Sequence, residues 1–115
     1  MKVLDIINRL GLSVYSGQEG LDNEIHGGYV SDLLSDVMGR AKEKQVWITL
    51  QTHKNVMAIA SLKDLAAVIL INGVKPDDDT IKQSNMEGLP LLGSNDTAFN
   101  ISGKLYKLFK ENEII

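Results

Sequence analysis

The chain has 115 residues and a mass of 12.6 kDa, the size of one domain, so a second, separate catalytic domain is not expected. Hydrophobic residues make up 43% and charged residues 23%, a globular composition that excludes a disordered chain. The net charge of −3 argues against a nucleic-acid partner, and the lack of cysteine excludes disulfides, thiolate metal sites and a cysteine nucleophile. Because no apolar run resembles a signal peptide or a membrane span, we expect a soluble, cytoplasmic protein without a membrane partner.

The first 25 residues are expected to form an opening helix and an edge segment. Residues 2–10 carry apolar side chains at helical spacing, and Gly11 follows, where a helix commonly ends. Residues 12–15 suit a short strand. Residues 25–31 are expected to be extended again, and their paired glycines, Gly27 and Gly28, indicate a bulge or a close approach of another backbone.

A short helix with one apolar side is predicted over residues 32–39. Beyond it, three short apolar runs recur at even spacing, at residues 45–50, 66–71 and 89–92, and such runs are typical of buried parallel strands. The segments between them, residues 54–62 and 77–86, read as helices. Strands that alternate with helices predict an α/β fold, a small layered domain with a mixed, largely parallel sheet to which the N-terminal segments add antiparallel edge strands.

Polar residues at the helix starts are expected to be caps. Asp77 and the two aspartates after it precede the fourth helix, where carboxylates interact favourably with the helix dipole. A last helix is predicted over residues 97–112, with either Asn95 or Asp96 as its cap. The lysines of this helix, at positions 104, 107 and 110, are interpreted as a solvated face.

Motifs for cofactor, metal or covalent chemistry are missing. Gly103 and Lys104 superficially match a phosphate-binding P-loop, but Ala98 and Leu105 occupy positions where that motif needs a glycine and a Ser or Thr. The two histidines are 27 positions apart without a second ligand at helical spacing, so neither a metal site nor a cofactor is expected. The sequence therefore predicts a protein that is not an enzyme.

Polar residues follow each predicted strand of the second half. In an open parallel sheet, ligands bind beyond the carboxyl ends of the strands, where helix N-termini favour anions. We therefore expect a small anionic or nucleotide-like effector at a rim formed by Gln51, Thr52, His53, Asn72, Asn95, Asp96 and Thr97. The alternative is a small enzyme in which His53 acts as general base near Asp96.

Large apolar side chains are more numerous than one small sheet and its helices need. Aromatic residues and Met are enriched in interface cores, so a homodimer is expected. The alternative is that these residues pack inside the domain, as is expected for Trp47 in its strand. The residues are Tyr29, Leu33, Leu34, Val37, Met38, Trp47, Phe99, Tyr106 and Phe109.

Several stretches resemble, in order and spacing, a DRTGG domain, the module related to the N-terminal domain of HPr kinase/phosphorylase. They are residues 31–35 (SDLLS), 37–41 (VMGRA), 47–53 (WITLQTH) and 88–92 (GLPLL), the last followed by Asp96 and Thr97. The resemblance covers residues 27–108, so residues 1–115 are interpreted as one DRTGG-like domain with a family core at 27–108. The sequence QTHKN at residues 51–55 stands where the family has an Asp-Arg pair.

The resemblance implies an α/β fold similar to the HPr kinase N-terminal domain and to the UDP-binding N-terminal domain of Mur ligases. In HPr kinase the catalytic machinery lies in a separate P-loop domain, and elsewhere the DRTGG module is an accessory domain. The resemblance therefore implies a non-catalytic regulatory or ligand-binding module, which senses an effector or docks to a cytoplasmic metabolic or redox enzyme.

Overall fold

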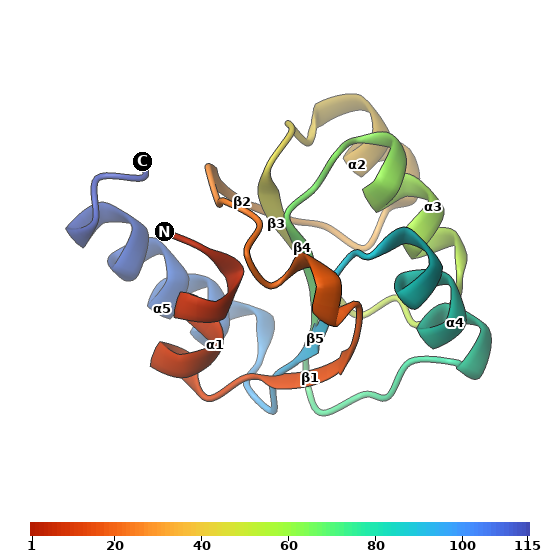
Figure 1. Cartoon of the computed structure of the whole chain (residues 1–115). Coiled ribbons are helices and arrows are strands. Elements are labelled where there is room, and N and C mark those ends of the chain that lie inside the picture. Colours follow the sequence, from red (N-terminus) through yellow and green to blue (C-terminus); the bar gives the residue numbers. More distant parts are fainter.

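The computed structural model describes all 115 residues, which build a five-stranded sheet. The strands are β1 (Ser13–Ser16), β2 (Gly27–Val30), β3 (Gln45–Thr49), β4 (Ala67–Leu70) and β5 (Leu91–Gly93). Their order in the sheet is β1-β5-β4-β3-β2, with β1 antiparallel to β5 and the other four strands parallel. β1 and β2 are therefore the two edges of a mixed, largely parallel sheet (Figure 1).

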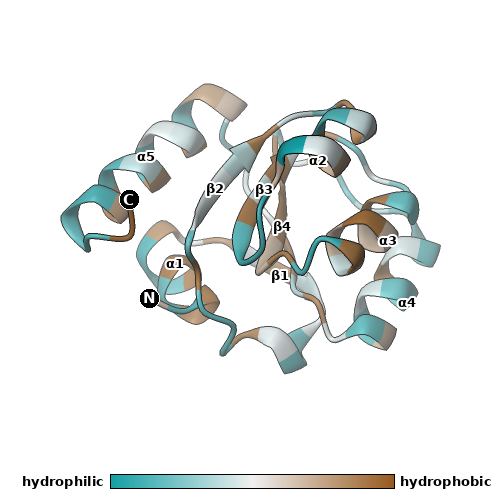
Figure 2. Ribbon diagram, turned by 90° about the horizontal axis from the view of Figure 1, so that it is seen from above, coloured by the Kyte–Doolittle hydropathy of each residue, from teal (hydrophilic) through white to brown (hydrophobic).

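Helices cover both faces of the sheet, which makes a three-layered α/β domain. The helices are α1 (Val3–Leu10), α2 (Leu34–Arg40), α3 (Asn55–Leu62), α4 (Asp78–Glu87) and α5 (Ala98–Glu111), with a short 3-10 helix at Gln18–Gly20. Helices α1 and α5 lie on one face, and α2, α3 and α4 lie on the other (Figure 1, Figure 2). None of the helices combines the length and the apolar composition that a bilayer span requires.

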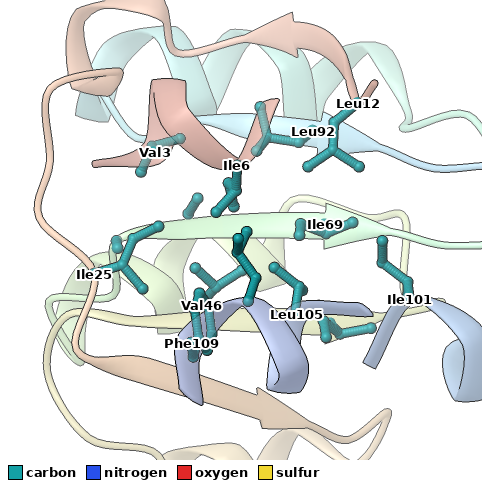
Figure 3. Close-up of a cluster of buried hydrophobic side chains, with 14 of the residues drawn as sticks. Val3, Ile6, Leu12, Ile25, Val46, Ile69, Leu92, Ile101, Leu105 and Phe109 are labelled. Carbon is teal, nitrogen blue, oxygen red and sulfur yellow. The ribbon is translucent and has the colours of Figure 1, made fainter. Parts of the chain in front are cut away.

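Alternating side chains of the central strands enter two separate hydrophobic cores. In β3, Val46 and Ile48 face the α1/α5 side, whereas Trp47 between them packs on the α2/α3 side. Every residue of β4 is buried, which is why this strand reads as a continuous apolar run and is brown in Figure 2. Figure 3 shows the first core, where Ile6 of α1 and Phe109 of α5 are among the residues packed against the strands.

The expected fold class is confirmed, but β2 runs in the opposite direction to the prediction. It pairs in parallel with β3, from Gly27 opposite Gln45 to Val30 opposite Ile48. The physical reason is the connection: α2 lies between the two strands, and a crossover through a helix returns the chain parallel to its first strand. Only β1 is the antiparallel edge strand that the sequence predicted.

Of the two alternatives for the paired glycines, the bulge is wrong, and a Cβ atom at Gly28 would be 3.6 Å from the backbone oxygen of Val46, an ordinary contact. β2 pairs with β3 without a register shift, and the shift lies in β1, between Val14 and Ser16. The third apolar run begins its strand at Leu91, two residues later than predicted. Pro90 has no N–H group to donate to a strand ladder, although its carbonyl still accepts a 3.0 Å hydrogen bond from the backbone of Val68.

Helix starts differ from the prediction in three places. Neither Asn95 nor Asp96 caps α5; Thr97 does, because its hydroxyl accepts a hydrogen bond from the backbone N–H of Asn100. Asp77 occupies the N-cap position of α4 as predicted, but its side chain makes no capping hydrogen bond. The helix expected from residue 32 starts at Leu34, because the carboxylate of the aspartate at position 32 binds the neighbouring strand instead.

Candidate functional site

The connections after β4 and β5 diverge at the carboxyl ends of these neighbouring strands. The chain leaves β4 toward α4 on one face of the sheet and leaves β5 toward α5 on the other face (Figure 1). A crevice between diverging connections of this kind is where open α/β sheets bind ligands. Four of the predicted site residues, Asn72, Asn95, Asp96 and Thr97, lie in these two connections.

Backbone hydrogen bonds hold the two connections together. The N–H of Asn72 donates to the carbonyl of Asp96 at 2.9 Å, and the N–H of Gly73 donates to the carbonyl of Ser94 at 2.9 Å. Both donors have left-handed backbones, with φ of 55° and 66°. Glycine suits the second of these positions because its φ of 66° strains other residues, and a Cβ atom there would also lie 2.9 Å from Oδ1 of Asn95. The structure therefore brings Asn72, Asn95 and Asp96 together.

Opposite charges meet at the start of α5. The Nζ atom of Lys104 donates to Oδ2 of Asp96 at 2.8 Å, with the aspartate side chain 32% exposed. Thr97 is exposed and caps the helix whose first backbone N–H groups point toward the same end of the sheet. Lys104 therefore offsets the charge of Asp96 beside the first backbone N–H groups of α5.

Gln51, Thr52 and His53 form a second group after β3, and Asp32 organises it. Oδ1 of Asp32 accepts hydrogen bonds from the N–H of Leu50 at 2.7 Å and from the hydroxyl of Thr49 at 2.9 Å. The side-chain amide of Gln51 donates to the carbonyl of Asp32 at 3.0 Å. The sequence prediction missed Asp32, although an aspartate directly after an extended segment is a recognisable signal for a local anchor.

Thr52 connects this second group to α4. Its carbonyl accepts from the N–H of Asp77 at 3.1 Å and from the hydroxyl of Thr80 at 2.7 Å. Residues 71–77 therefore touch both groups, with their first residues bound to the β5 connection and their last to Thr52. No hydrogen bond joins the two groups directly, so the seven predicted residues share one edge of the sheet in two clusters.

The structure does not form the His53 and Asp96 pair that the enzyme alternative requires. The half-buried side chain of His53 makes no hydrogen bond and no ion pair, and the carboxylate of Asp96 is bound to Lys104. None of the seven predicted residues lines a cavity. No group of three or more His, Asp or Glu side chains is placed to hold a metal ion.

The apolar residues expected at a dimer interface are divided between the interior and the surface. Val37, Trp47 and Phe109 are buried, and the indole N–H of Trp47 donates to the carbonyl of Ser31 at 2.8 Å. The exposed ones are Leu33 and Met38 around α2, and Phe99 and Tyr106 on α5, at 65%, 40%, 86% and 60% exposure.

Tyr29, another of these residues, is half-buried between β2 and α2. Its hydroxyl donates to Oδ2 of Asp36 at 2.8 Å. This hydrogen bond, desolvation and the negative charge of Asp36 raise the pKa of Tyr29, while Arg40 acts in the opposite direction. Tyr29 therefore ties the edge strand to α2 and is not a free interface residue.

Comparison with known proteins gives a likeness of fold. No family model matches the sequence, and no curated protein matches it. The chain is similar to the crystal structure of the CBS and DRTGG domains of the regulatory region of Clostridium perfringens pyrophosphatase, complexed with its activator, diadenosine tetraphosphate. The TM-score is 0.66 at 12% sequence identity, over 90% of this chain and 45% of the other. The chain therefore has a DRTGG-like α/β fold and spans less than half of the regulatory-region chain that it matches.

Proposed function

We propose that the chain is a non-catalytic regulatory module that binds a small anionic or nucleotide-like effector at the carboxyl end of the sheet. The observation that carries this proposal is the arrangement of the connections that follow β4 and β5. They lead to opposite faces of the sheet, and their first residues, held together by backbone hydrogen bonds, bring Asn72, Asn95 and Asp96 to the carboxyl end of the sheet beside Thr97. The likeness to a regulatory region complexed with a nucleotide activator supports it. Residues 27–108 would be the family core of one such domain.

The chemistry of this end of the sheet suits phosphate or carboxylate oxygens. The exposed amide side chains of Asn72 and Asn95 are hydrogen-bond donors, and so are the first backbone N–H groups of α5. Lys104 supplies a positive charge, and its ion pair reduces the repulsion between Asp96 and an anion. The second group, Gln51, Thr52 and His53, would contact a larger, nucleotide-sized ligand along the same edge.

A thermal-shift screen with ATP, diadenosine tetraphosphate and inorganic pyrophosphate tests the proposal. A ligand that binds only the folded state raises stability by about 2.7 kcal/mol at a hundredfold excess over Kd. Amide chemical shifts, followed by NMR, should then change at Asn72, Asn95 and Thr97. Asn95→Ala should weaken binding about tenfold, the loss of one hydrogen bond to a charged group. Asn8→Ala, which changes an exposed asparagine of α1, is the matched control.

Two results would overturn the proposal. Shift changes confined to another face of the domain would remove the carboxyl end of the sheet as the effector site. Nucleotide hydrolysis or acyl or phosphoryl transfer by the purified chain, lost in His53→Ala, would replace the regulatory module with an enzyme.

We also propose that the module docks to a cytoplasmic metabolic or redox enzyme. A separate proposal is that the module forms a homodimer through the exposed apolar surface beside the β2 edge. Val30, Phe99 and Tyr106 line one groove there, and Phe99 is 86% exposed. Size exclusion with light scattering should give twice the monomer mass of 12.6 kDa at tens of micromolar, and Phe99→Glu should return it to the monomer. A monomer mass for the unchanged chain contradicts the dimer.

A further inference from the structure

A pocket of about 240 Å³ lies between the edge strand β2 and helix α5, away from the seven residues of the proposed effector site. Gly28 and Ile48 line it on the sheet side, and Leu105, Tyr106 and Phe109 line it on the helix side. Figure 3 shows Leu105 and Phe109 of α5 beside Val46, the residue paired with Gly28 in the sheet. The pocket is therefore a gap at the margin of the α1/α5 core.

The gap exists because β2 has no side chain at Gly27 and Gly28 and contributes only Val30, which is half exposed, to the lining. A Cβ atom at Gly28 would lie 3.6 Å from Cε2 of Phe109, which is ordinary contact, so the space under α5 would accept a side chain there. Gly28 is instead exposed, whereas its partner Val46 is fully buried. As β2 is the edge of the sheet, no further strand covers this side.

Ser102 leaves a polar atom without a partner at this pocket. Its Oγ is the one buried side-chain oxygen or nitrogen of the chain that makes no hydrogen bond. The residue lines both the pocket and the groove beside Phe99. A buried hydroxyl without a partner costs free energy that an alanine, the better helix former, would not cost. Because this Oγ is closed to solvent, it can bond to an occupant of the pocket only when the Ser102 side chain turns toward it.

Gln45 provides a second unused group in the pocket. Its Oε1 accepts from the N–H of Lys42 at 2.7 Å, while its Nε2 has no acceptor. No Asp, Glu, Lys or Arg side chain lines the pocket, and the imidazole of His26, which does, is 56% exposed and lies 3.8 Å from the carboxylate of Glu24. The buried part of the lining therefore carries no charge, which favours an uncharged occupant. The rings of Tyr106 and Phe109 favour an aromatic occupant, stacked or edge to face.

We propose that this pocket binds an uncharged heteroaromatic ring of the size of a nucleobase, which hydrogen-bonds to Oγ of Ser102 and Nε2 of Gln45. The proposal does not depend on the effector site at the carboxyl end of the sheet. The probe is adenine, with indole as a bicyclic ring that lacks ring-nitrogen acceptors and benzoate as a charged aromatic compound. Titrations are followed by amide shifts in NMR.

Adenine should shift the amide signals of Gly28, Ser102 and Tyr106, and these shifts should reach saturation. Benzoate should cause no shift, and indole should bind at least tenfold more weakly than adenine. Ser102→Ala should weaken adenine binding about tenfold without lowering the melting temperature of the free protein, because it removes an unpartnered hydroxyl. Gly28→Val should abolish binding by filling the pocket, and the strand accommodates a β-branched residue well. Ser35→Ala, at an exposed serine of α2 without side-chain hydrogen bonds, is the matched control and should change neither property.

Three results would overturn the proposal. Indole binding as tightly as adenine would remove the hydrogen-bonding role, and adenine shifts restricted to Asn72 and Asn95 would belong to the effector site alone. Pocket amides that shift with protein concentration in the absence of adenine, and that adenine does not move, would show that a second copy of the chain fills the pocket. If Gly28→Val does not fold, Ser102→Ala decides the question by itself.

Discussion

Ser16 donates a 2.8 Å hydrogen bond to the hydroxyl of Ser84, although 68 positions separate them in the sequence. Ser84 in turn donates to the carbonyl of Leu89 at 2.7 Å, and Ser84 is fully buried. The chain of two hydrogen bonds joins the edge strand β1 to α4 and to the turn that leads into β5. These hydrogen bonds fix the position of α4 relative to the antiparallel edge strand. The apolar contacts of the core do not fix that position by themselves.

Ser84→Ala should lower the free energy of unfolding by about 1–3 kcal/mol, because it leaves the buried hydroxyl of Ser16 and the carbonyl of Leu89 without partners. Adding Ser16→Ala removes one of these unpaired groups. The double variant should therefore lose less free energy of unfolding than the two single variants lose in sum. Urea denaturation followed by Trp47 fluorescence measures all three. Strictly additive effects would show that the two hydroxyls do not interact.

Trp47→Phe should destabilise the protein by about 2 kcal/mol. The substitution leaves a cavity in the α2/α3 core and deprives the carbonyl of Ser31 of its 2.8 Å hydrogen bond from the indole. Circular dichroism during urea denaturation is the measurement, because the chain contains one tryptophan and the variant has none. A change below about 0.5 kcal/mol would contradict the burial of this side chain.

Asp32→Ala should lower the free energy of unfolding by about 1 kcal/mol, because it removes the acceptor of the Leu50 N–H and the Thr49 hydroxyl. The loss is moderate because Asp32 itself is exposed. The control is Asp22→Ala, at another exposed aspartate, whose side chain makes no hydrogen bond or ion pair; its effect should stay within about 0.5 kcal/mol. The amide shift of Leu50 should move in Asp32→Ala and not in the control. Equal effects of the two substitutions would remove Asp32 as an anchor of the rim.

Tyr29 should ionise at higher pH than its ordinary pKa of 10.0, chiefly because its hydroxyl is held by the Asp36 carboxylate. A pKa raised by folding means that the folded state binds this proton more tightly. The resulting stability is complete below the unfolded-state pKa of 10.0 and is lost as the pH rises through the folded-state pKa.

Ultraviolet absorbance of tyrosinate measures this titration. Tyr29→Phe should remove the step at highest pH, and Asp36→Asn should move it downward, because the carboxylate is gone. Tyr106→Phe, at an exposed tyrosine without a hydrogen bond, is the control and should leave that step in place. A highest-pH step that survives Tyr29→Phe would contradict the assignment.

The sequence by itself determined the elements and the layered α/β class, because these depend on local periodicity. The apolar run of β4 is buried on both sides, and the stripe of α5 faces the sheet, so hydrophobic burial alone places them. It also placed the predicted rim residues in loops that follow β3, β4 and β5, since chain direction in parallel strands puts their carboxyl ends at one edge.

The tertiary structure alone decided the relations that join distant residues. The direction of β2 depends on where α2 crosses, and the anchor between Asp32 and Leu50 spans 18 positions. The pocket under α5 lies where Gly28 of the edge strand, which has no side chain, faces Phe109 of the helix, a pairing that neither local sequence encodes. Such contacts depend on which elements pack against each other. The periodicity of one segment shows which of its faces is buried but not which element covers that face.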